Sequence, residues 1–587
     1  MAGASVTESL VYQYGCPAWY GLPPQLITGS WSVEERYEGP QGPPGQLLLA
    51  SRLWNRLVEV QQTHEKEKAA IWASVPEVAA AQAAHDVTQA VLDACYARVR
   101  AARREDQTTV PRDDDRTALT AAKAAAVAAR AARDAARAQA LPGLRKQFMA
   151  AKQVRADAIR ALYSEFTVMG LGWGTFNDIA KPASGRFDRA VKKVDEARVQ
   201  GHAAELRSRP FDGTGTLTVQ VMGGAGVPPR TIPALNSGTH RRSGVMRLAP
   251  WADPAAGRPK GKARHGTLAL TIGRSRDLGP VQVEIPVVVD RYIPADAEVR
   301  EVKVTRFRQG ARYRIRIAIV CTQPFRPRPG NGGPVTLWLD WRDAGGGWVA
   351  VAHVASATPL PPVPQGASSI VRVAEDRMTA DVLYHPAWRK LLGRDRDIQS
   401  TRDQNLNMLR DRIVTALQSN PSLAAAVRAD PAAVGRWKSP IRFAQIAARW
   451  PTDHPLHDDL AGWRARDRHL LEFQAHESAQ VLAARKDAYR CVAKWLSEAA
   501  SAMEIDGTRI AAARRIPPDD QEDPHAVRGA RRLVHDAAPG ELRAAVLSAA
   551  ARRGIPVTTA TSERRQQISL AAQSRRDGLV VARSTSR

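Results

Sequence analysis

The sequence has few cysteines and no long hydrophobic run, and both shortages restrict what the protein can be. Its four cysteines, Cys16, Cys95, Cys321 and Cys491, are far apart and form no CxxC pair, so we expect neither a disulfide framework nor zinc. No uninterrupted apolar stretch approaches membrane-spanning length. The first residues lack a basic segment followed by an apolar one, which argues against secretion. We therefore expect a cytoplasmic protein with no membrane partner.

Acidic residues are also in short supply. The 587-residue chain carries 85 Lys and Arg against 59 Asp and Glu, a formal net charge of +26 that is spread along its length. A protein this basic attracts polyanions, with an affinity that falls steeply as salt rises. Nucleic acid is a better candidate than an anionic membrane surface, because no long basic amphipathic helix with an aromatic and leucine face is found. A chain of this length should form several domains.

The sequence between residues 47 and 209 is typical of helices. Its Ala-rich stretch "RTALTAAKAAAVAARAARDAARAQAL" predicts one long helix that ends at Pro142-Gly143. Arg130, Arg133 and Arg137 recur three to four residues apart, so they share one helix face. Two interpretations stay open for this face, a solvated helical hairpin and a surface that contacts phosphates.

Alternating β-branched segments follow between residues 210 and 325, and their Gly and Pro turns predict a small β-barrel. The last two predicted strands are rich in arginine. Three of these arginines alternate in one strand and so share a face, which suggests a surface that follows a nucleic-acid backbone. The candidate nucleic-acid-binding residues of this region are Arg306, Arg308, Arg312, Arg314 and Arg316. Residues 326–334 then read as a linker.

The segment "GGPVTLWLDWRDAGGGWVAVAHV" predicts a hairpin whose first strand ends on Asp340. Apolar residues alternate from Val335 to Leu339, and Gly345-Gly346-Gly347 supplies the turn. An acid at this position is either a metal ligand of a nuclease or a cap of the turn. Helical segments follow, then a strand in "SAMEIDG", a helix in "PGELRAAVLSAAARRG", a strand in "IPVTTAT" and a final helix around "RRQQISLAAQSRR".

The helical segment "WRARDRHLLEFQAHESAQVLAARKDAYRCVAKWLSEAA" combines an apolar stripe with a basic one. The apolar stripe, predicted to face a core, consists of Leu482, Tyr489, Val492, Ala493 and Leu496. The candidate nucleic-acid-binding residues of this segment are Arg464, Arg468, Arg485, Lys486, Arg490 and Lys494.

The order of elements from Val335 onward resembles that of a ribonuclease-H-like RuvC domain. The segment "RKDAYRCVAKWL" resembles the helix that precedes the second acidic strand in TnpB nucleases and type V CRISPR effectors. The segment "LRAAVLSAAARRGIPVTTAT" resembles the helix and strand that lead into their zinc ribbon. The chain as a whole resembles a miniature type V CRISPR effector, most closely of subtype V-M.

This resemblance implies an α+β multidomain protein. A helical recognition lobe is inserted into a small wedge β-barrel, and a ribonuclease-H-like RuvC domain with helical insertions follows. The implied domains are 1–46, the lead-in with the first barrel strand; 47–209, the recognition lobe; 210–325, the wedge barrel; 326–334, the linker; 335–540, the RuvC-like domain with a helical insert at about 385–455; and 541–587, a reduced target-nucleic-acid-binding region with the last RuvC helix.

The resemblance also implies where a nuclease site would lie and what it lacks. RuvC nucleases hold two metal ions with three carboxylates. Asp340 matches the first carboxylate, and either Glu504 or Asp506 matches the second, with Asp506 favoured because it ends the strand. No acid stands at the third position, since Glu563 and Asp577 are off register, and the zinc-ribbon cysteines are absent. We therefore expect a remnant site in which Asp340 and Asp506 bind Mg²⁺ weakly at most.

The function implied by the resemblance is RNA-guided binding of DNA. A CRISPR RNA would serve as cofactor and pair with one strand of a double-stranded target, next to a T-rich motif on its 5′ side, within a monomeric ribonucleoprotein. Silencing would follow from occupancy with little or no cleavage. Two alternatives stay open: an active RuvC nuclease whose site is completed by Glu563 or Asp577, and an architectural nucleic-acid-binding protein without sequence preference.

Overall fold

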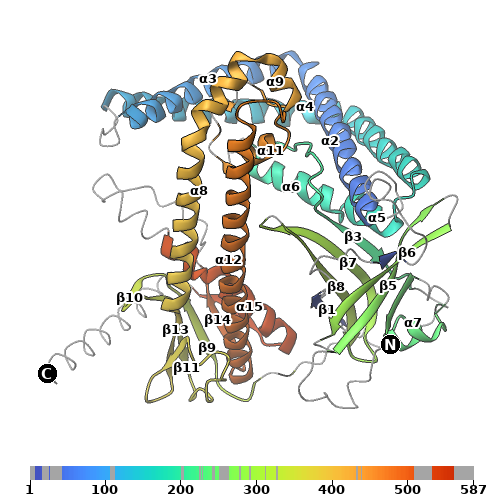
Figure 1. The fold of residues 1–587 in the computed structure, drawn as a ribbon, viewed down its shortest axis with the longest axis vertical. Helices are drawn as coiled ribbons and strands as arrows, with labels where there is room; N and C mark the ends of the chain where they lie inside the picture. The colour runs from blue at the N-terminus through green and yellow to red at the C-terminus, as the bar shows by residue number, and fades with distance from the viewer. Residues whose placement is uncertain are drawn as a thin grey trace. The chain divides into compact units, whose positions relative to one another are not determined.

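The computed structural model describes residues 7–15, 25–26, 43–105, 113–199, 204–223, 227, 229–240, 245–249, 264–275, 279–289, 293–310, 312–324, 328, 330–430, 434–435, 437, 439–507 and 532–560. These residues form the expected α+β structure, with long helices and two β-sheets (Figure 1). They divide into two compact units. The first comprises Met1–Ser9, Arg308–Arg314 and Thr322–Arg587, and the second comprises Leu10–Phe307 and Ile315–Cys321. None of the described helices has the length and hydropathy of a membrane span.

The second unit contains the helices of the N-terminal part of the chain. They are α2 (Pro43–Ala73), α3 (Pro76–Glu105), α4 (Asp113–Val168), α5 (Trp173–Ala180), α6 (Arg186–Val199) and α7 (Ile232–Ser237). Helices α3 and α4 pack along each other, and α2 packs against α4 (Figure 1). Helices α2, α4, α5 and α6 enclose a buried core, which includes Leu53, Leu57, Phe166, Phe176 and Phe187.

Helix α4 continues through Pro142, so the predicted helix end at this residue is wrong. Proline removes one backbone hydrogen bond and crowds the preceding turn. The helix nevertheless packs against α3 and α2. Ala126 before the proline and Leu144 and Leu162 after it are buried. Tertiary packing on both sides therefore outweighs the local penalty, as is common for helices in proteins.

The second unit also contains most of an eight-stranded sheet, while the strand residues within Met1–Ser9, Arg308–Arg314 and 322–324 belong to the first unit. Its strands are β1 (Thr7–Gly15), β2 (Gln25–Leu26), β3 (Gly215–Gln220), β4 (Met246–Ala249), β5 (Arg264–Ser275), β6 (Gly279–Val289), β7 (Glu298–Gln309) and β8 (Arg312–Pro324). The strand order is β3-β7-β8-β1-β6-β5-β4, with β2 paired to β6. The pairing of the described strands follows this open path and is not a closed barrel. Ile315, Ile317 and Ile319 of β8 alternate into the sheet core, as the sequence predicts.

The first unit is built on a seven-stranded sheet. Its strands are β9 (Val335–Leu339), β10 (Asp343–Gly345), β11 (Trp348–Ser356), β12 (Val371–Val373), β13 (Thr379–Tyr384), β14 (Met503–Asp506) and β15 (Val557–Ala560). The order is β12-β13-β11-β9-β14-β15, with β10 paired to β11. Strands β12, β13, β11 and β9 pair with one another in antiparallel fashion, whereas β14 runs parallel to both β9 and β15.

The predicted glycine turn joins β10 to β11. Gly345, Gly346 and Gly347 have φ angles of 81°, 58° and 82°, in the left-handed region that side chains with a Cβ atom disfavour. This turn returns the chain so that His353 of β11 pairs with Trp338 of β9.

The described helices of the first unit are α8 (Pro386–Ser419), α9 (Pro421–Ala426), α11 (Pro440–Ala447), α12 (His457–Ala499) and α15 (Pro539–Arg553). Helices α12 and α15 cover one face of the sheet. Leu337 and Val351 of the sheet share one buried core with Tyr489 of α12 and Leu542 of α15. Helix α8 runs beside α12 (Figure 1), and these helices form a second core with α9 and α11.

The apolar stripe of α12 is buried with one exception. Tyr489, Val492, Ala493 and Leu496 are at most 1% exposed, whereas Leu482 is 38% exposed. The prediction for Leu482 is wrong because the neighbouring Val481 takes the inward position. The predicted final helix, with Glu563 and Asp577, lies outside the described residues.

Candidate functional site

Polar side chains gather on the sheet face opposite α12 and α15. Val335, Leu337 and Leu339 of β9 point into the core, so Thr336 and Trp338 point to the other face.

Residues directly opposite one another on paired strands share a face. His353 pairs with Trp338, Asp381 of β13 pairs with His353, and Arg372 of β12 pairs with Asp381. Arg372, Asp381 and His353 therefore form a polar row across the antiparallel part of the sheet, and His353 contacts Asp340.

Asp340 lies one residue beyond β9, at the strand end that the sequence predicts. Its backbone N–H donates to the carbonyl of Val351 at 2.9 Å, which continues the ladder between β9 and β11. Its Oδ1 atom accepts hydrogen bonds from the backbone N–H groups of Trp341 and Arg342, at 2.7 and 3.1 Å. The carboxylate therefore caps the turn, which was one of the two interpretations of this acid.

Two cationic side chains also contact the Asp340 carboxylate. Nε of Arg342 donates to Oδ1 at 3.1 Å and lies 3.3 Å from Oδ2. Nε2 of His353 lies 2.9 Å from Oδ2. Burial alone would raise the pKa of Asp340, but the hydrogen bonds from His353 and Arg342 outweigh it and hold this pKa well below its usual range.

His353 is held by a carboxylate on each side. Its Nδ1 atom lies 2.5 Å from Oδ1 of Asp381, while Nε2 faces Asp340. Carboxylate oxygens only accept hydrogen bonds, so a ring that donates from both nitrogens satisfies both contacts. Burial disfavours the charged ring, but the hydrogen bonds to Asp340 and Asp381 outweigh it and raise the pKa of His353 to about 9. His353 is therefore an imidazolium at neutral pH.

The two candidates for a second acid differ in position. Asp506 ends β14 and is 3% exposed. Its Oδ2 atom accepts a hydrogen bond from the backbone N–H of Leu339, the residue before Asp340, at 3.4 Å. Glu504 lies two residues earlier, beside Thr336, whose hydroxyl donates to it at 3.4 Å. Asp506 therefore approaches the end of β9 that carries Asp340, whereas Glu504 lies further back along the strand.

These residues do not fit a divalent metal ion. Both oxygens of Asp340 are engaged by Arg342 or His353, which are positively charged. Hard divalent cations need several free oxygen ligands. Within the residues that the structure describes, no three His, Cys, Asp or Glu side chains converge as a metal site. The carboxylate has an internal countercharge instead.

Sequence reasoning identified Asp340 but missed its partners. His353 and Asp381 stand in strands that are otherwise mostly apolar, and Arg342 follows Asp340 by two residues. The sequence signal that could have found them is a charged or ionisable residue within a mostly apolar strand, His353 in "WVAVAHVAS" and Asp381 in "TADVLY". Their meeting at Asp340 depends on the strand register, which the sequence did not specify.

Three of the predicted nucleic-acid-binding arginines line one groove in the first unit. Arg308, Arg464 and Arg468 border a groove of about 280 Å³ together with Ile441 and Leu471. Arg464 and Arg468 are exposed on α12. The buried Asp467 at this groove is paired with Arg402 of α8 through two hydrogen bonds of 2.7 and 3.1 Å. The groove therefore carries arginine side chains next to a buried ion pair that joins α8 to α12.

The basic residues further along α12 fall into two groups. Lys486, Arg490 and Lys494 have side chains that are 52%, 55% and 75% exposed, and they form the basic stripe. Arg485 differs, because it is buried and donates to Glu541 at 2.8 Å and to the carbonyl of Asp536 at 2.7 Å. Arg485 therefore joins α12 to α15 and its neighbouring turn, and it is not available to nucleic acid as predicted.

The arginines of β7 and β8 are placed less uniformly. Because Ile315 and Ile317 are buried, Arg314 and Arg316 point to the opposite face of β8. Arg316 is exposed, and its guanidinium lies 4.9 Å from the ring centre of Phe307. Arg306 is partly buried, and the side chain of Arg312 lies outside the described part of the structure.

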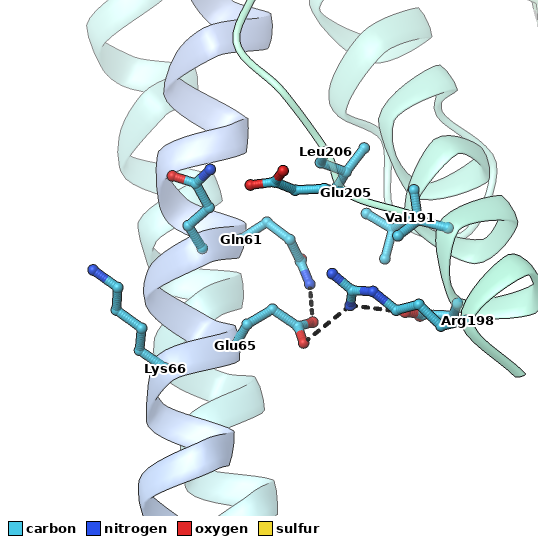
Figure 2. Close-up of a pocket in the computed structure, with 10 residues that line it drawn as sticks. Gln61, Glu65, Lys66, Val191, Arg198, Glu205 and Leu206 are labelled. Atoms are coloured by element: carbon cyan, nitrogen blue, oxygen red, sulfur yellow. Dashed lines mark hydrogen bonds and ion pairs between the residues drawn. The ribbon is translucent and has the colours of Figure 1, made fainter. Parts of the chain in front are cut away.

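A second groove, in the helical part of the second unit, has a different character (Figure 2). It measures about 350 Å³ and lies between α2, α6 and the chain that follows α6. Its charged lining residues are Glu65, Lys66, Asp195, Arg198 and Glu205. Arg198 crosses the groove to Glu65 at 3.5 Å. With more acids than bases, this groove is poorly suited to phosphate.

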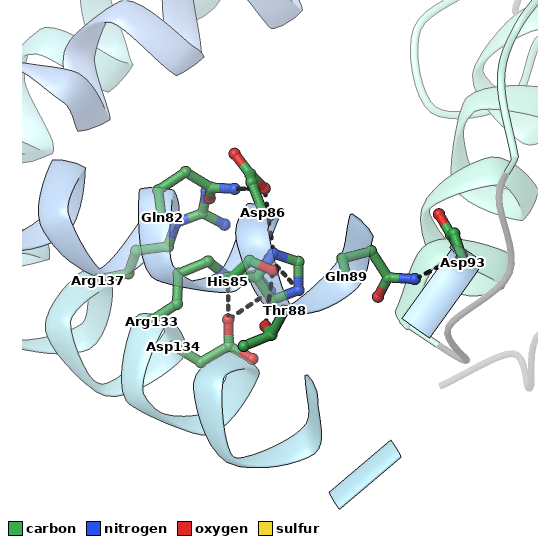
Figure 3. A network of polar contacts seen from close by, with 9 residues as sticks. All are labelled: Gln82, His85, Asp86, Thr88, Gln89, Asp93, Arg133, Asp134 and Arg137. Atoms are coloured by element: carbon green, nitrogen blue, oxygen red, sulfur yellow. Dashed lines mark hydrogen bonds and ion pairs between the residues drawn. The ribbon is translucent and has the colours of Figure 1, made fainter. Parts of the chain in front are cut away.

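The arginine face of α4 makes contacts within the protein (Figure 3). Arg137 donates to Gln82 of α3 at 2.8 Å, and Arg133 lies 3.4 Å from Nε2 of His85. Arg130 donates to the carbonyl of Val199 at 2.6 Å. These contacts support the helical-hairpin interpretation of this face.

Comparisons with known proteins give the class of the chain. No family model matches it. A solved complex of Cas12f1 with guide RNA and target DNA is similar over 94% of this chain and 89% of its own, at 7% identity and a TM-score of 0.30, too low to carry an inference. A CRISPR-associated DNA-binding protein Cas12m from Mycolicibacterium mucogenicum is 32% identical, over 91% of this chain and 90% of its own. A second Cas12m, from Gordonia otitidis, is 28% identical over 90% and 89%.

Identity at this level over nine tenths of both chains defines the class, that of the type V CRISPR effectors. The chain belongs to the Cas12m family. The resemblance to subtype V-M that the sequence indicates is thereby confirmed.

Proposed function

We propose that this protein is a CRISPR RNA-guided effector that binds double-stranded DNA and silences it by occupancy, with little or no cleavage. The names of its relatives, CRISPR-associated DNA-binding proteins, support the binding activity. The observation that carries the absence of cleavage is the Asp340 carboxylate, which is engaged by Arg342 and His353. A two-metal nuclease needs that carboxylate free for its ions. No catalytic step is therefore assigned to Mg²⁺ at this site.

The sheet of the first unit supports a RuvC-like interpretation of residues 335–540 together with α15 and β15, which continue the same core and sheet beyond residue 540. Its order β12-β13-β11-β9-β14-β15, with β14 and β15 parallel to β9, is the order expected of a ribonuclease-H-like sheet. We propose further that residues 47–209 are the recognition lobe, that residues 210–325 are the wedge, and that 541–587 contain the reduced target-binding region and the last RuvC helix. Residues 1–46 are the lead-in to the wedge, and 326–334 the linker.

Recognition would divide between RNA and protein. The CRISPR RNA reads the target by base pairing, and the protein holds the heteroduplex by its shape and phosphate charge. The groove with Arg308, Arg464 and Arg468, the basic stripe of Lys486, Arg490 and Lys494, and the exposed Arg316 are candidates for phosphate contacts. The protein reads a T-rich motif on the 5′ side of the target and acts as a monomeric ribonucleoprotein in the cytoplasm.

The test is a comparison of binding and cleavage on the same duplex. The protein is loaded with a CRISPR RNA and incubated with matched and scrambled DNA in Mg²⁺ or Mn²⁺, and samples are run on native and denaturing gels. We expect stable binding to matched DNA that stays intact. Efficient cutting would instead favour an active nuclease completed by Glu563 or Asp577. Equal binding of scrambled DNA, or a heterogeneous mixture of co-purified RNA, would favour an architectural protein.

A further inference from the structure

The carboxylate of Asp340 is contacted by two basic side chains from different parts of the sheet. Arg342 contacts it from the turn that follows β9, through both its backbone N–H and its Nε atom. His353 contacts it from the neighbouring strand β11, through Nε2. Asp340 itself is only 6% exposed, whereas the side chain of Arg342 is half-exposed.

We propose that Arg342 and His353 occupy the place of a divalent cation at Asp340 and keep metal ions out. We call the three residues the cation lock. The proposal deepens the proposed function, on which it rests, because it names the groups that disable the first nuclease carboxylate. It attributes the loss of metal binding to two added cations as well as to a missing third acid.

The hydrogen-bond count at the carboxylate supports the lock. Oδ1 accepts from two backbone N–H groups and from Arg342, and Oδ2 lies within hydrogen-bond distance of both His353 and Nε of Arg342, at 2.9 and 3.3 Å. A carboxylate offers about four lone-pair positions in total. An incoming metal ion would therefore have to displace at least one side chain before it found an oxygen.

Displacing these side chains is unfavourable for two reasons. Charges of like sign repel, so a divalent ion beside the guanidinium of Arg342 is disfavoured. In addition, Nδ1 of His353 lies 2.5 Å from Oδ1 of Asp381, so the ring cannot rotate away from Asp340 without breaking this second contact. The strand register that pairs His353 with both Trp338 and Asp381 fixes this arrangement.

The test measures metal binding without nucleic acid. Mn²⁺ is titrated into the full-length, guide-free protein at neutral pH, and the free ion is followed by electron paramagnetic resonance. The variants are Asp340→Asn, Arg342→Ala, Arg342→Ala with His353→Asn, and this double variant with Asp340→Asn added. Arg342→Lys serves as the matched control, since it retains the positive charge.

We expect the wild type, Asp340→Asn and Arg342→Lys to bind the same amount of Mn²⁺. The double variant should bind one further ion per chain, and Asp340→Asn in that background should abolish the gain. Binding by the wild type that Asp340→Asn removes would overturn the proposal, as would a folded double variant with no gain. If the double variant does not fold, Arg342→Ala is measured in its place, because the Arg342 side chain is half-exposed and its removal should be tolerated. A gain in bound Mn²⁺ in Arg342→Ala would support the proposal, and no gain would overturn it.

The outcome is separate from that of the proposed function. Guide-dependent binding of DNA is measured on the loaded complex, whereas the lock is measured on the free protein. A protein that cuts DNA while its Asp340 binds no Mn²⁺ would refute the proposed function and leave the lock intact. A protein that binds Mn²⁺ through Asp340 without cutting DNA would refute the cation lock and leave the proposed function intact.

Discussion

Nε2 of His353 lies 2.9 Å from Oδ2 of Asp340, although the two residues stand on neighbouring strands and share no sequence motif. The contact joins the middle of β11 to the end of β9. It makes the most obvious nuclease residue of the chain part of an ion-pair network with Arg342 and Asp381.

Substitution of Asp340 by alanine should separate stability from function. We expect guide-dependent DNA binding and silencing to be unchanged, because occupancy depends on slow dissociation and not on chemistry. Stability should fall by about 1–3 kcal/mol, because buried donors lose their acceptor. Melting temperatures and binding isotherms of the loaded complex check both expectations. Asp343→Asn is the control and should change neither, because it removes the exposed charge that faces Arg389 but keeps an acceptor for the backbone N–H of Gly345. Loss of a cleavage activity in Asp340→Ala would contradict the proposed function.

The raised pKa of His353 makes stability depend on pH. A group whose pKa is higher in the folded state stabilises the protein fully below its unfolded pKa, and this stabilisation disappears as pH rises through the folded value. The contribution of His353 should therefore be complete below pH 6.5, decline above it, and vanish above about pH 9. The measurement is the difference in melting temperature between the wild type and His353→Asn from pH 6 to 10. Asp381→Asn should move the decline to lower pH, since it removes one of the two carboxylates. A difference that grows above pH 9 would contradict this assignment.

The basic stripe of α12 should contribute affinity without sequence preference. Replacing Lys486, Arg490 and Lys494 by alanine should weaken binding of every matched target. The slope of log K against log salt should fall by about 1 for each phosphate that the variant no longer neutralises. The control keeps the charge, with arginine at positions 486 and 494. Binding is measured at several salt concentrations on targets with different flanking motifs. A changed motif preference at unchanged affinity would show that the stripe reads bases.

The buried pair of Arg402 and Asp467 should be far more important than an exposed pair on the same two helices. Both side chains are at most 3% exposed, so Arg402→Ala leaves a buried charge and should cost about 3–5 kcal/mol. Arg412 and Asp459 also join α8 to α12, but they are 54% and 51% exposed, and Arg412→Ala should cost at most about 1 kcal/mol. Thermal unfolding compares the variants. Arg402→Met with Asp467→Leu should recover most of the stability, and failure to do so would show that the pair is needed for more than charge balance.

The sequence predicted the order of elements around the site well. Alternation of apolar residues located β9, and Asp340 lies at its end as expected. The strand with Asp506 and the helix and strand after it are also where the patterns indicated. These predictions succeed because each rests on local periodicity, which depends on neighbours within a few residues.

The misses share a physical cause, because each depends on contacts between distant segments. Pro142 is a helix breaker by itself, yet packing against α2 and α3 carries α4 through it. Arg485 looks like part of a basic surface until α15 covers it. His353 becomes a partner of Asp340 only through the register of two strands. The boundaries of the proposed domains and the remaining nucleic-acid contacts stay predictions.

Helix α12 passes through two cores without a break. Trp463 belongs to the core with α8 and α11, and Tyr489 belongs to the core beneath the sheet. About seven turns of helix, roughly 39 Å, separate them. Any insertion or deletion between these residues rotates one core relative to the other by about 100° per residue. Changes of about 18 residues, or approximately of 7 or 11, return both faces to their partners. The length of this segment can therefore vary in evolution or by engineering only in steps of nearly whole turns. Each step would change the distance between the two cores along the helix axis by about 1.5 Å per residue.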